Sequence, residues 1–193
     1  MVGVSRAAAA FDNVRVGRFT LADDFNDNFL NPGFWRVQDG IVGTVSETNQ
    51  RLEMMPTGPV GTGVGIVSQW SLPGDFDVQV DYILLNWPAN GSKGLQLRAE
   101  SLGVGPTGPV SIARTALPQE TYLMDFADHV ISTPTTDTSG TLRLVRSGAT
   151  LSGYFRSSST GGNWVLVSSG TVSTAPTISS DCSSTLFFMA WPV

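Results

Sequence analysis

The chain has 193 residues, which is enough for one domain with a substantial hydrophobic core. Its net charge is −5 and its eleven cationic side chains are scattered. A nucleic-acid partner or an anionic membrane surface is therefore not expected, because both require clustered positive charge. Charged residues make up 14% of the chain, below the usual quarter or so, so Ser, Thr, Gly and Asn must supply much of the polar surface. This composition favours short strands joined by turns.

The N-terminal segment and the single cysteine give no sign of export or of disulfides. Residues 1–10 are small and apolar but too short an apolar run for a signal peptide, and we predict an arm without a core of its own. No stretch is long enough for a transmembrane helix. Cys182 and His129 are single residues of their kind, so they form neither an internal disulfide nor a zinc site. We expect Cys182 to be a small buried core residue.

The first strand is predicted over residues 11–18. Simple alternation places Val14 and Val16 on one face and Phe11 on the other. Polar clusters then predict turns, after which Phe34 and Trp35 are expected to return to the core.

The clearest strand runs from Phe76 to Leu85, where apolar residues alternate with Asp77, Gln79 and Asp81. Gly/Pro-rich loops are expected at 56–65 and 103–110. Other strands are predicted at 42–55 (a hairpin around 48–50), 94–99, 110–114, 121–126, 129–131, 140–147 with 150–156 (across a tight turn at 148–149), 163–167 and 185–190. No amphipathic helix is evident, so the pattern indicates an all-β sandwich or barrel.

Five segments of the chain together resemble the concanavalin A-like lectin/glucanase superfamily. They are ADDFNDNFLNPGFW (22–35), VSETNQRLEM (45–54), PGDFDVQVDY (73–82), GTLRLVRSGATLSGYFR (140–156) and NWVLV (163–167). The similarity is strongest to laminin-G-like jelly-roll modules of bacterial and phage surface proteins and covers Phe11 to Ala190. It implies an antiparallel β-sandwich jelly roll, with residues 11–193 as a single domain. It says little about function, because lectins, glycosidases and inert structural modules share this fold.

One departure from the family concerns assembly. The resemblance implies that a strand reading like FDNVRV closes the domain at its C-terminal end, but here it stands at the front, at 11–18. We expect Phe11, Val14 and Val16 to fill the vacant position in a sandwich. The strand can belong to its own sandwich as in a circular permutation, to a neighbouring subunit in a head-to-tail chain, or to a preceding module of a tandem array.

The resemblance also implies a calcium site where the first and last strands meet. Residue by residue, Asp12 matches the ligand of the last strand, and Asp23 or Asp24 matches the ligands near the first. Hard oxygen ligands suit calcium. The alternative is that Asp23, Asp24 and Asp27 cap turns.

No catalytic set is recognisable, and we expect a protein that is not an enzyme. The family's glycosidases use two glutamates and an aspartate on one strand, and none of the four glutamates here has that spacing. Asp75, Asp77 and Asp81 are interpreted as a solvated strand face. The remaining acidic group is Glu120 with Asp125 and Asp128, a weak candidate for a carboxylate pair. His129 is expected to be structural or at the surface.

Exposed aromatic rings beside amides are candidates for carbohydrate binding, because a ring stacks on the apolar face of a sugar. Trp87, with Asn86 and Asn90, is the best candidate, followed by Tyr122 and Trp164. A core position remains the alternative for each of the three rings. Trp35, Phe76 and Tyr82 are assigned to the core.

Two functions outside the cell, on a cell surface or on a virion are therefore expected first. One is a non-catalytic structural or attachment module, such as a virion decoration or filament subunit that contacts copies of itself or another surface protein. The other is a lectin-like module that binds glycans. A glycoside hydrolase with an atypical acid pair is a third, weaker hypothesis. Membrane insertion is not expected.

Overall fold

The structure is a computed structural model that describes residues 7–17, 22–38, 42–59, 62–72, 74–89, 92–101, 110–116, 119–126, 129–171 and 184–191. Within these ranges the chain is all-β, and every strand pairing is antiparallel. The same ranges contain no helix that could span a membrane.

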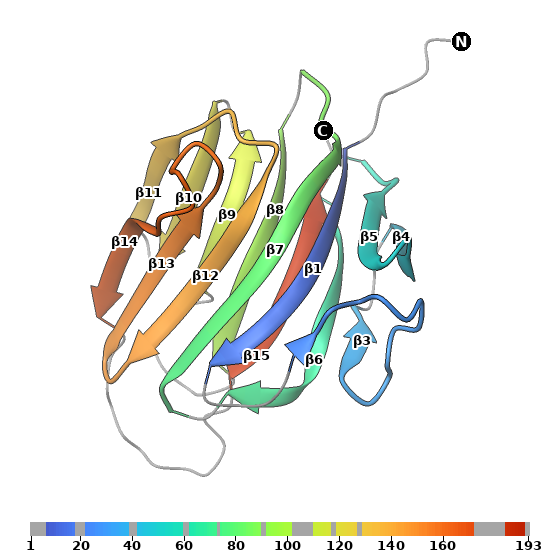
Figure 1. Ribbon diagram of the computed structural model, residues 1–193, viewed down its shortest axis with the longest axis horizontal. Helices are drawn as coiled ribbons and strands as arrows, with labels where there is room; N and C mark the ends of the chain where they lie inside the picture. Colours follow the sequence, from blue (N-terminus) through green and yellow to red (C-terminus); the bar gives the residue numbers. More distant parts are fainter. Residues whose placement is uncertain are drawn as a thin grey trace.

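The strands form two sheets (Figure 1). The eight-stranded sheet has the order β14 (Val165–Thr171), β13 (Thr150–Arg156), β12 (Ser139–Ser147), β7 (Phe76–Asn86), β1 (Ala8–Gly17), β5 (Arg51–Pro56) and β4 (Gly43–Thr48), with β2 (Ala22–Asp23) paired to β1. The seven-stranded sheet has the order β11 (His129–Pro134), β10 (Glu120–Phe126), β9 (Val110–Ala116), β8 (Lys93–Ser101), β15 (Ser184–Trp191), β6 (Val64–Leu72) and β3 (Trp35–Val37).

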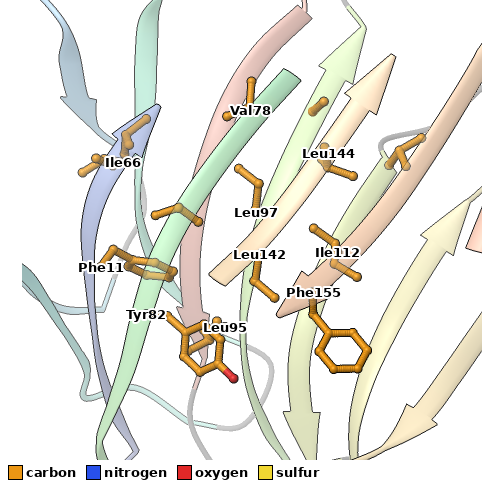
Figure 2. Close-up of a cluster of buried hydrophobic side chains, with 14 of the residues drawn as sticks. Phe11, Ile66, Val78, Tyr82, Leu95, Leu97, Ile112, Leu142, Leu144 and Phe155 are labelled. Carbon is orange, nitrogen blue, oxygen red and sulfur yellow. The ribbon is translucent and has the colours of Figure 1, made fainter. Parts of the chain in front are cut away.

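The two sheets face each other across one hydrophobic core, which gives a β-sandwich-like arrangement. Figure 2 shows part of that core, with Phe11, Tyr82 and Leu142 from the eight-stranded sheet and Leu97 and Ile112 from the other. The inner faces approach so closely at one point that a Cβ on Gly153 of β13 would lie 2.6 Å from the Met124 sulfur of β10. Each fully buried aliphatic or aromatic side chain contributes roughly 1.5–3 kcal/mol to stability.

The alternation predicted for the strand at 76–85 is confirmed in β7. β7 buries Phe76, Val78, Val80 and Tyr82 and leaves the intervening residues half-buried. The hairpin expected between 42 and 55 is β4–β5, and both its turn residues, Asn49 and Gln50, have positive φ. The tight turn between β12 and β13 uses Gly148 at a φ of 57°, a conformation that glycine adopts without a Cβ penalty.

β1 begins earlier than the sequence predicted. It starts at Ala8 instead of residue 11, and Ala7, Ala8, Ala9 and Ala10 are buried. The arm expected over residues 1–10 is therefore too long, because its last residues belong to the core. Small alanine side chains suit this position, where β1 is paired with β5 on one side and β7 on the other.

The predicted facing of β1 is wrong, and a β-bulge explains why. The register with β7 shifts between Asp12 and Arg15, and Asn13 has a φ of 51°. The extra residue reverses the alternation, so Phe11, Val14 and Val16 all point into the core with exposures of 0%, 0% and 3%. The backbone N–H of Asn13 donates to Asp12 Oδ1 (2.8 Å), and the side-chain amide of Asn13 donates to Asp81 Oδ2 (3.2 Å).

Of the two aromatic residues expected to re-enter the core at 34–35, only one does. Trp35 is 2% exposed and packs against Phe25 and Trp70, each with a ring-centroid distance of 5.8 Å. Phe34 is 38% exposed. The amides of Phe34 (3.0 Å) and Trp35 (2.9 Å) both donate to the Asn31 carbonyl in the turn that leads into β3, and of the two adjacent rings only that of Trp35 enters the core.

Candidate functional site

A polar cluster centred on Glu120 joins the two sheets at one end of the sandwich. Glu120 is the first residue of β10, and its carboxylate accepts hydrogen bonds from the indole nitrogen of Trp87 at 2.8 and 3.0 Å. It also forms an ion pair with Arg114 of β9. Trp87 directly follows β7, so this carboxylate links the end of β7 in one sheet to the start of β10 in the other.

Two buried cations lie against Trp87. Lys93 is 0% exposed and Arg114 is 1% exposed. The Lys93 ammonium lies 5.2 Å and the Arg114 guanidinium 5.3 Å from the indole centroid, which is within the range of cation–π attraction. Burial lowers the pKa of Lys93; Glu120 opposes this effect, and Arg114 adds to it. Trp87 is therefore a firmly held, half-buried ring.

Asp137, in the turn between β11 and β12, is the centre of a second network. Its Oδ2 accepts hydrogen bonds from four hydroxyl groups. The donors are Tyr122 (3.0 Å), Thr135 (2.9 Å), Ser157 (2.7 Å) and Ser159 (2.9 Å). Its backbone carbonyl accepts from Arg114 Nε (3.1 Å), which connects this network to the Glu120 cluster.

These hydrogen bonds decide the charge of Asp137. Burial opposes ionisation of this carboxyl, but the bonds from Ser157, Thr135, Ser159 and Tyr122 outweigh it and hold the pKa of Asp137 below its usual value. Asp137 is therefore a carboxylate at neutral pH. Burial raises the pKa of Tyr122 to about 12, so its hydroxyl remains a donor.

A hollow of about 550 Å³ opens beside these two networks. It lies between the start of β10, the end of β11 and the loop after β13, whose path crosses in front of β10 and β11 in Figure 1. Its lining is formed by Gln119, Glu120, Pro134, Thr135, Thr136, Phe155, Ser159 and Thr160. Six of these eight residues carry a hydroxyl, amide or carboxylate group, beside Pro134 and Phe155, so the hollow offers polar groups next to apolar surface.

The predicted carbohydrate-binding residues do not all gather here. Trp87 and exposed Asn86 lie beside the Glu120 cluster, and Asn90 lies outside the described residues. Tyr122 is 0% exposed and stacks on Phe155 at 3.8 Å, so it takes the core position that was its alternative and cannot stack on a sugar. Its hydroxyl instead bonds Tyr82 (2.7 Å) and Asp137.

Trp164 lies elsewhere, on the outer face of the eight-stranded sheet. The guanidinium carbons of Arg143 and Arg156 lie 5.0 and 4.7 Å from its ring. Arg143 is held by Asp77 of β7 through bonds of 2.8 and 2.6 Å, which raise the pKa of that guanidinium. The ring is half-buried and packed against these cations, so it fastens the loop after β13 to the sheet.

The carboxylates expected to bind calcium are engaged separately. Asp23 accepts from the Phe25 amide (3.0 Å) and from the Trp35 indole (2.6 Å), and Asp24 accepts from the Asn26 side chain (2.6 Å). The Asp23 bond to the Phe25 amide and the bond from the Phe29 amide to Asp27 (2.9 Å) are the turn caps of the alternative, whereas Asp24 bonds a side chain. In the described part of the chain no three His, Cys, Asp or Glu side chains form a group that could hold a metal ion. These hydrogen bonds do not join Asp12, Asp23 and Asp24 as a ligand set, and calcium binding stays a prediction.

The weak acid pair does not form among the described residues. Glu120 and buried Tyr122 are two residues apart on β10 and therefore lie on the same face of the strand. Exposed Asp125 is an odd number of residues away and points to the other face. Asp128 and Cys182 lie outside the described residues, and His129 is the first residue of β11. Asp75, Asp77 and Asp81 each bond a neighbouring strand or turn.

Most residues of the two networks were missed from the sequence. Asp137, Ser157, Ser159, Lys93 and Arg114 carry no motif, and they converge only through the fold. The sequence offered two weak signals: the Ser/Thr-rich turns at 132–138 and 157–160, and a lone lysine in a chain whose other cations are arginines.

Comparison with known proteins adds no relative: no family model, no curated protein and no solved structure matches this chain.

Proposed function

We propose that the protein is a non-catalytic carbohydrate-binding module of a surface or extracellular protein, with a concanavalin A-like jelly-roll fold. The observation that carries the proposal is the hollow beside Glu120. Its size falls within the range of about 300–1,000 Å³ that is usual for small-molecule sites. Its lining offers hydroxyl and carboxylate oxygens, the partners that sugar hydroxyls require.

The site is also rigid, which favours binding. Thr135 and Ser159 are fixed by the ionised Asp137, and Glu120 is fixed by Trp87 and Arg114. Groups that are held before the ligand arrives lose little conformational entropy on binding. Trp87 supports this role by fixing the lining rather than by offering a free stacking face.

A glycan array of the full chain, followed by calorimetric titration of the best oligosaccharide, tests the proposal. Thr136 is exposed in the lining and makes no hydrogen bond that would be lost, so Thr136→Trp fills the hollow with little cost to the fold. We expect this variant to lose binding and Thr44→Trp, on exposed edge strand β4, to retain it. Binding that survives Thr136→Trp would place the glycan elsewhere.

A structural or attachment module of a surface assembly is the second candidate. The feature that favours it is β1, a ten-residue strand that is encoded first in the chain yet lies between β7 and β5 inside the sheet. A strand in this position can be exchanged between copies, because a neighbour's β1 would make the same ladder bonds. Copies of the chain or another surface protein are the partners of this candidate.

A glycoside hydrolase is the least supported alternative. Glu120 is tied to Arg114 and Trp87, and no second carboxylate faces it across the hollow among the described lining residues. Hydrolysis requires two carboxyl groups on either side of the bond that is cut.

A further inference from the structure

Three of the four hydroxyl groups that line the hollow, those of Thr135, Ser159 and Thr160, have already donated their protons to the protein. A hydroxyl group has one proton to donate and two lone pairs with which to accept. Thr135 donates to Asp137 Oδ2 (2.9 Å) and accepts from the Asp137 amide (3.0 Å). Because Asp137 is ionised, its carboxylate can only accept, which fixes the direction of this bond.

Ser159 and Thr160 are oriented in the same way. Ser159 lies 2.9 Å from Asp137 Oδ2 and 2.8 Å from the Ser157 hydroxyl, so its proton points into the protein. Thr160 Oγ1 accepts from the Ser157 amide (3.1 Å) and donates to the Ser157 or Asn163 carbonyl, each at 2.9 Å. With their protons committed, these hydroxyls can meet a ligand in the hollow only as acceptors.

The charged group in the lining is also an acceptor. Glu120 is the one ionisable side chain among the lining residues that the structure describes, and 37% of it is exposed. Its ion-pair partner does not contribute a donor to the hollow, since the Arg114 nitrogens bond the Asp137 carbonyl, the Thr115 carbonyl (2.9 Å) and Glu120 itself. Among the described lining residues, the side chains thus supply fixed acceptors and a carboxylate, and the uncommitted side-chain donors are those of exposed Gln119 and Thr136.

From this polarity we infer that the preferred ligand is a glycan with an unsubstituted, protonated amino group, which binds beside Glu120 and the hydroxyl lone pairs. The inference rests on the proposed function and narrows it to a class of sugar. An ammonium group has three donors and no acceptor, which complements this lining, and its hydrogen bonds to a carboxylate are charge-assisted. A uronate or sulfated sugar would place acceptors against acceptors and a like charge beside Glu120.

Calorimetric titration of the full chain with four tetrasaccharides tests the inference. The probes are a glucosamine tetramer, its N-acetylated counterpart, cellotetraose and tetragalacturonate. At mildly acidic pH we expect the glucosamine tetramer to bind at least about tenfold more tightly than the others, which corresponds to about 1.4 kcal/mol. This advantage should fade as the pH rises through the pKa of the sugar amine.

Two substitutions of one lining residue separate charge from size. Thr136→Lys places a cation at the hollow, and Thr136→Gln adds a side chain of similar length without charge, so a loss common to both is steric. We expect Thr136→Lys to weaken the binding of the glucosamine tetramer by a further tenfold or so relative to Thr136→Gln. The distant Thr44→Lys should leave this binding unchanged. Equal losses in the two Thr136 variants would overturn the role of charge.

The outcomes for the inference and for the proposed function differ. If the N-acetylated tetramer, cellotetraose or tetragalacturonate binds as well as the glucosamine tetramer, the inference is wrong and the glycan-binding function stands. If no oligosaccharide binds, in this titration or on the array, both are wrong.

Discussion

At the scale of single residues, Asp137 is the side chain on which the candidate site most depends. It is 9% exposed and collects four hydroxyl donors on one oxygen. Replacing it with alanine would leave Tyr122 and Ser157 with buried donors and no carboxylate to accept them. Each unsatisfied buried donor costs roughly 1–3 kcal/mol.

We therefore expect Asp137→Ala to lower the free energy of unfolding by about 3 kcal/mol or more. Urea denaturation followed by tryptophan fluorescence measures this change. Asp125→Ala, an exposed position on β10, is the matched control and should stay within about 0.5 kcal/mol of wild type. Equal stability of the two variants would contradict the role given to Asp137.

The pH dependence of stability carries a second prediction for the same residue. The pKa of Asp137 is lowered in the folded protein, so its ionised form contributes stability above the ordinary pKa of an aspartate, and this contribution is lost as the pH falls through the folded pKa. The difference in unfolding free energy between wild type and Asp137→Asn should be largest near neutral pH and should shrink at acidic pH. A difference that stays constant with pH would show that charge is not involved.

At the scale of elements, the bulge in β1 determines which side chains reach the core. Asn13 takes a left-handed conformation, and this extra residue brings Phe11 and Val14 to the same side. Asparagine and glycine tolerate such a conformation, whereas a β-branched residue does not.

The effect of a substitution at Asn13 on stability should therefore depend on how well the new residue tolerates a left-handed backbone. We expect Asn13→Val to cost about 1–2 kcal/mol of unfolding free energy, because a left-handed β-branched residue is strained. Asn13→Gly relieves the strain but loses the bond to Asp81 (3.2 Å), so it should cost less than Asn13→Val. Thermal melts of the two variants provide the comparison; a glycine variant less stable than the valine variant would argue against the bulge.

At the scale of the whole molecule, β1 is required to complete the eight-stranded sheet. Its removal would expose the ladder edges of β7 and β5 and the space that Phe11 fills. In size-exclusion chromatography we expect the full chain to elute as a monomer and a variant lacking residues 1–17 to aggregate or unfold. A synthetic peptide of residues 7–17 should restore the truncated chain.

The same experiment distinguishes the two candidate functions. A full-length chain that elutes as a ladder of head-to-tail oligomers would favour exchange of β1 between copies and the structural role. A truncated chain that stays a compact monomer of wild-type stability would mean that β1 fills no gap in the sheet.

The calcium prediction is tested separately by thermal melting with and without chelator. Asp12 is the residue at which a bound cation should have the clearest effect. Burial raises the pKa of Asp12, and the like charges of Asp81 and Asp24 act in the same direction. A cation bound there would relieve this repulsion, so calcium should raise the melting temperature of the wild type and not that of Asp12→Ala. An unchanged melting temperature with chelator would count against calcium.

The sequence was sufficient for those parts of the fold that depend on local pattern. Alternation located β7, and turn chemistry located the β4–β5 and β12–β13 hairpins. It was not sufficient for the bulge, because one left-handed residue leaves the pattern of β1 almost unchanged. The hollow escaped prediction for a different reason: its lining comes from the start of β10, the end of β11 with the turn after it, and the end of β13 with the loop after it, and strand pairing and sheet packing bring these segments together.

The most direct test of the central claim is to map ligand binding on the amide resonances of the full chain by nuclear magnetic resonance. On titration with the best-binding oligosaccharide, the account predicts that the perturbed amides cluster at 119–120, 134–137 and 155–160. Perturbations confined to the outer face around Trp164, or to β1, would contradict the assignment of the site.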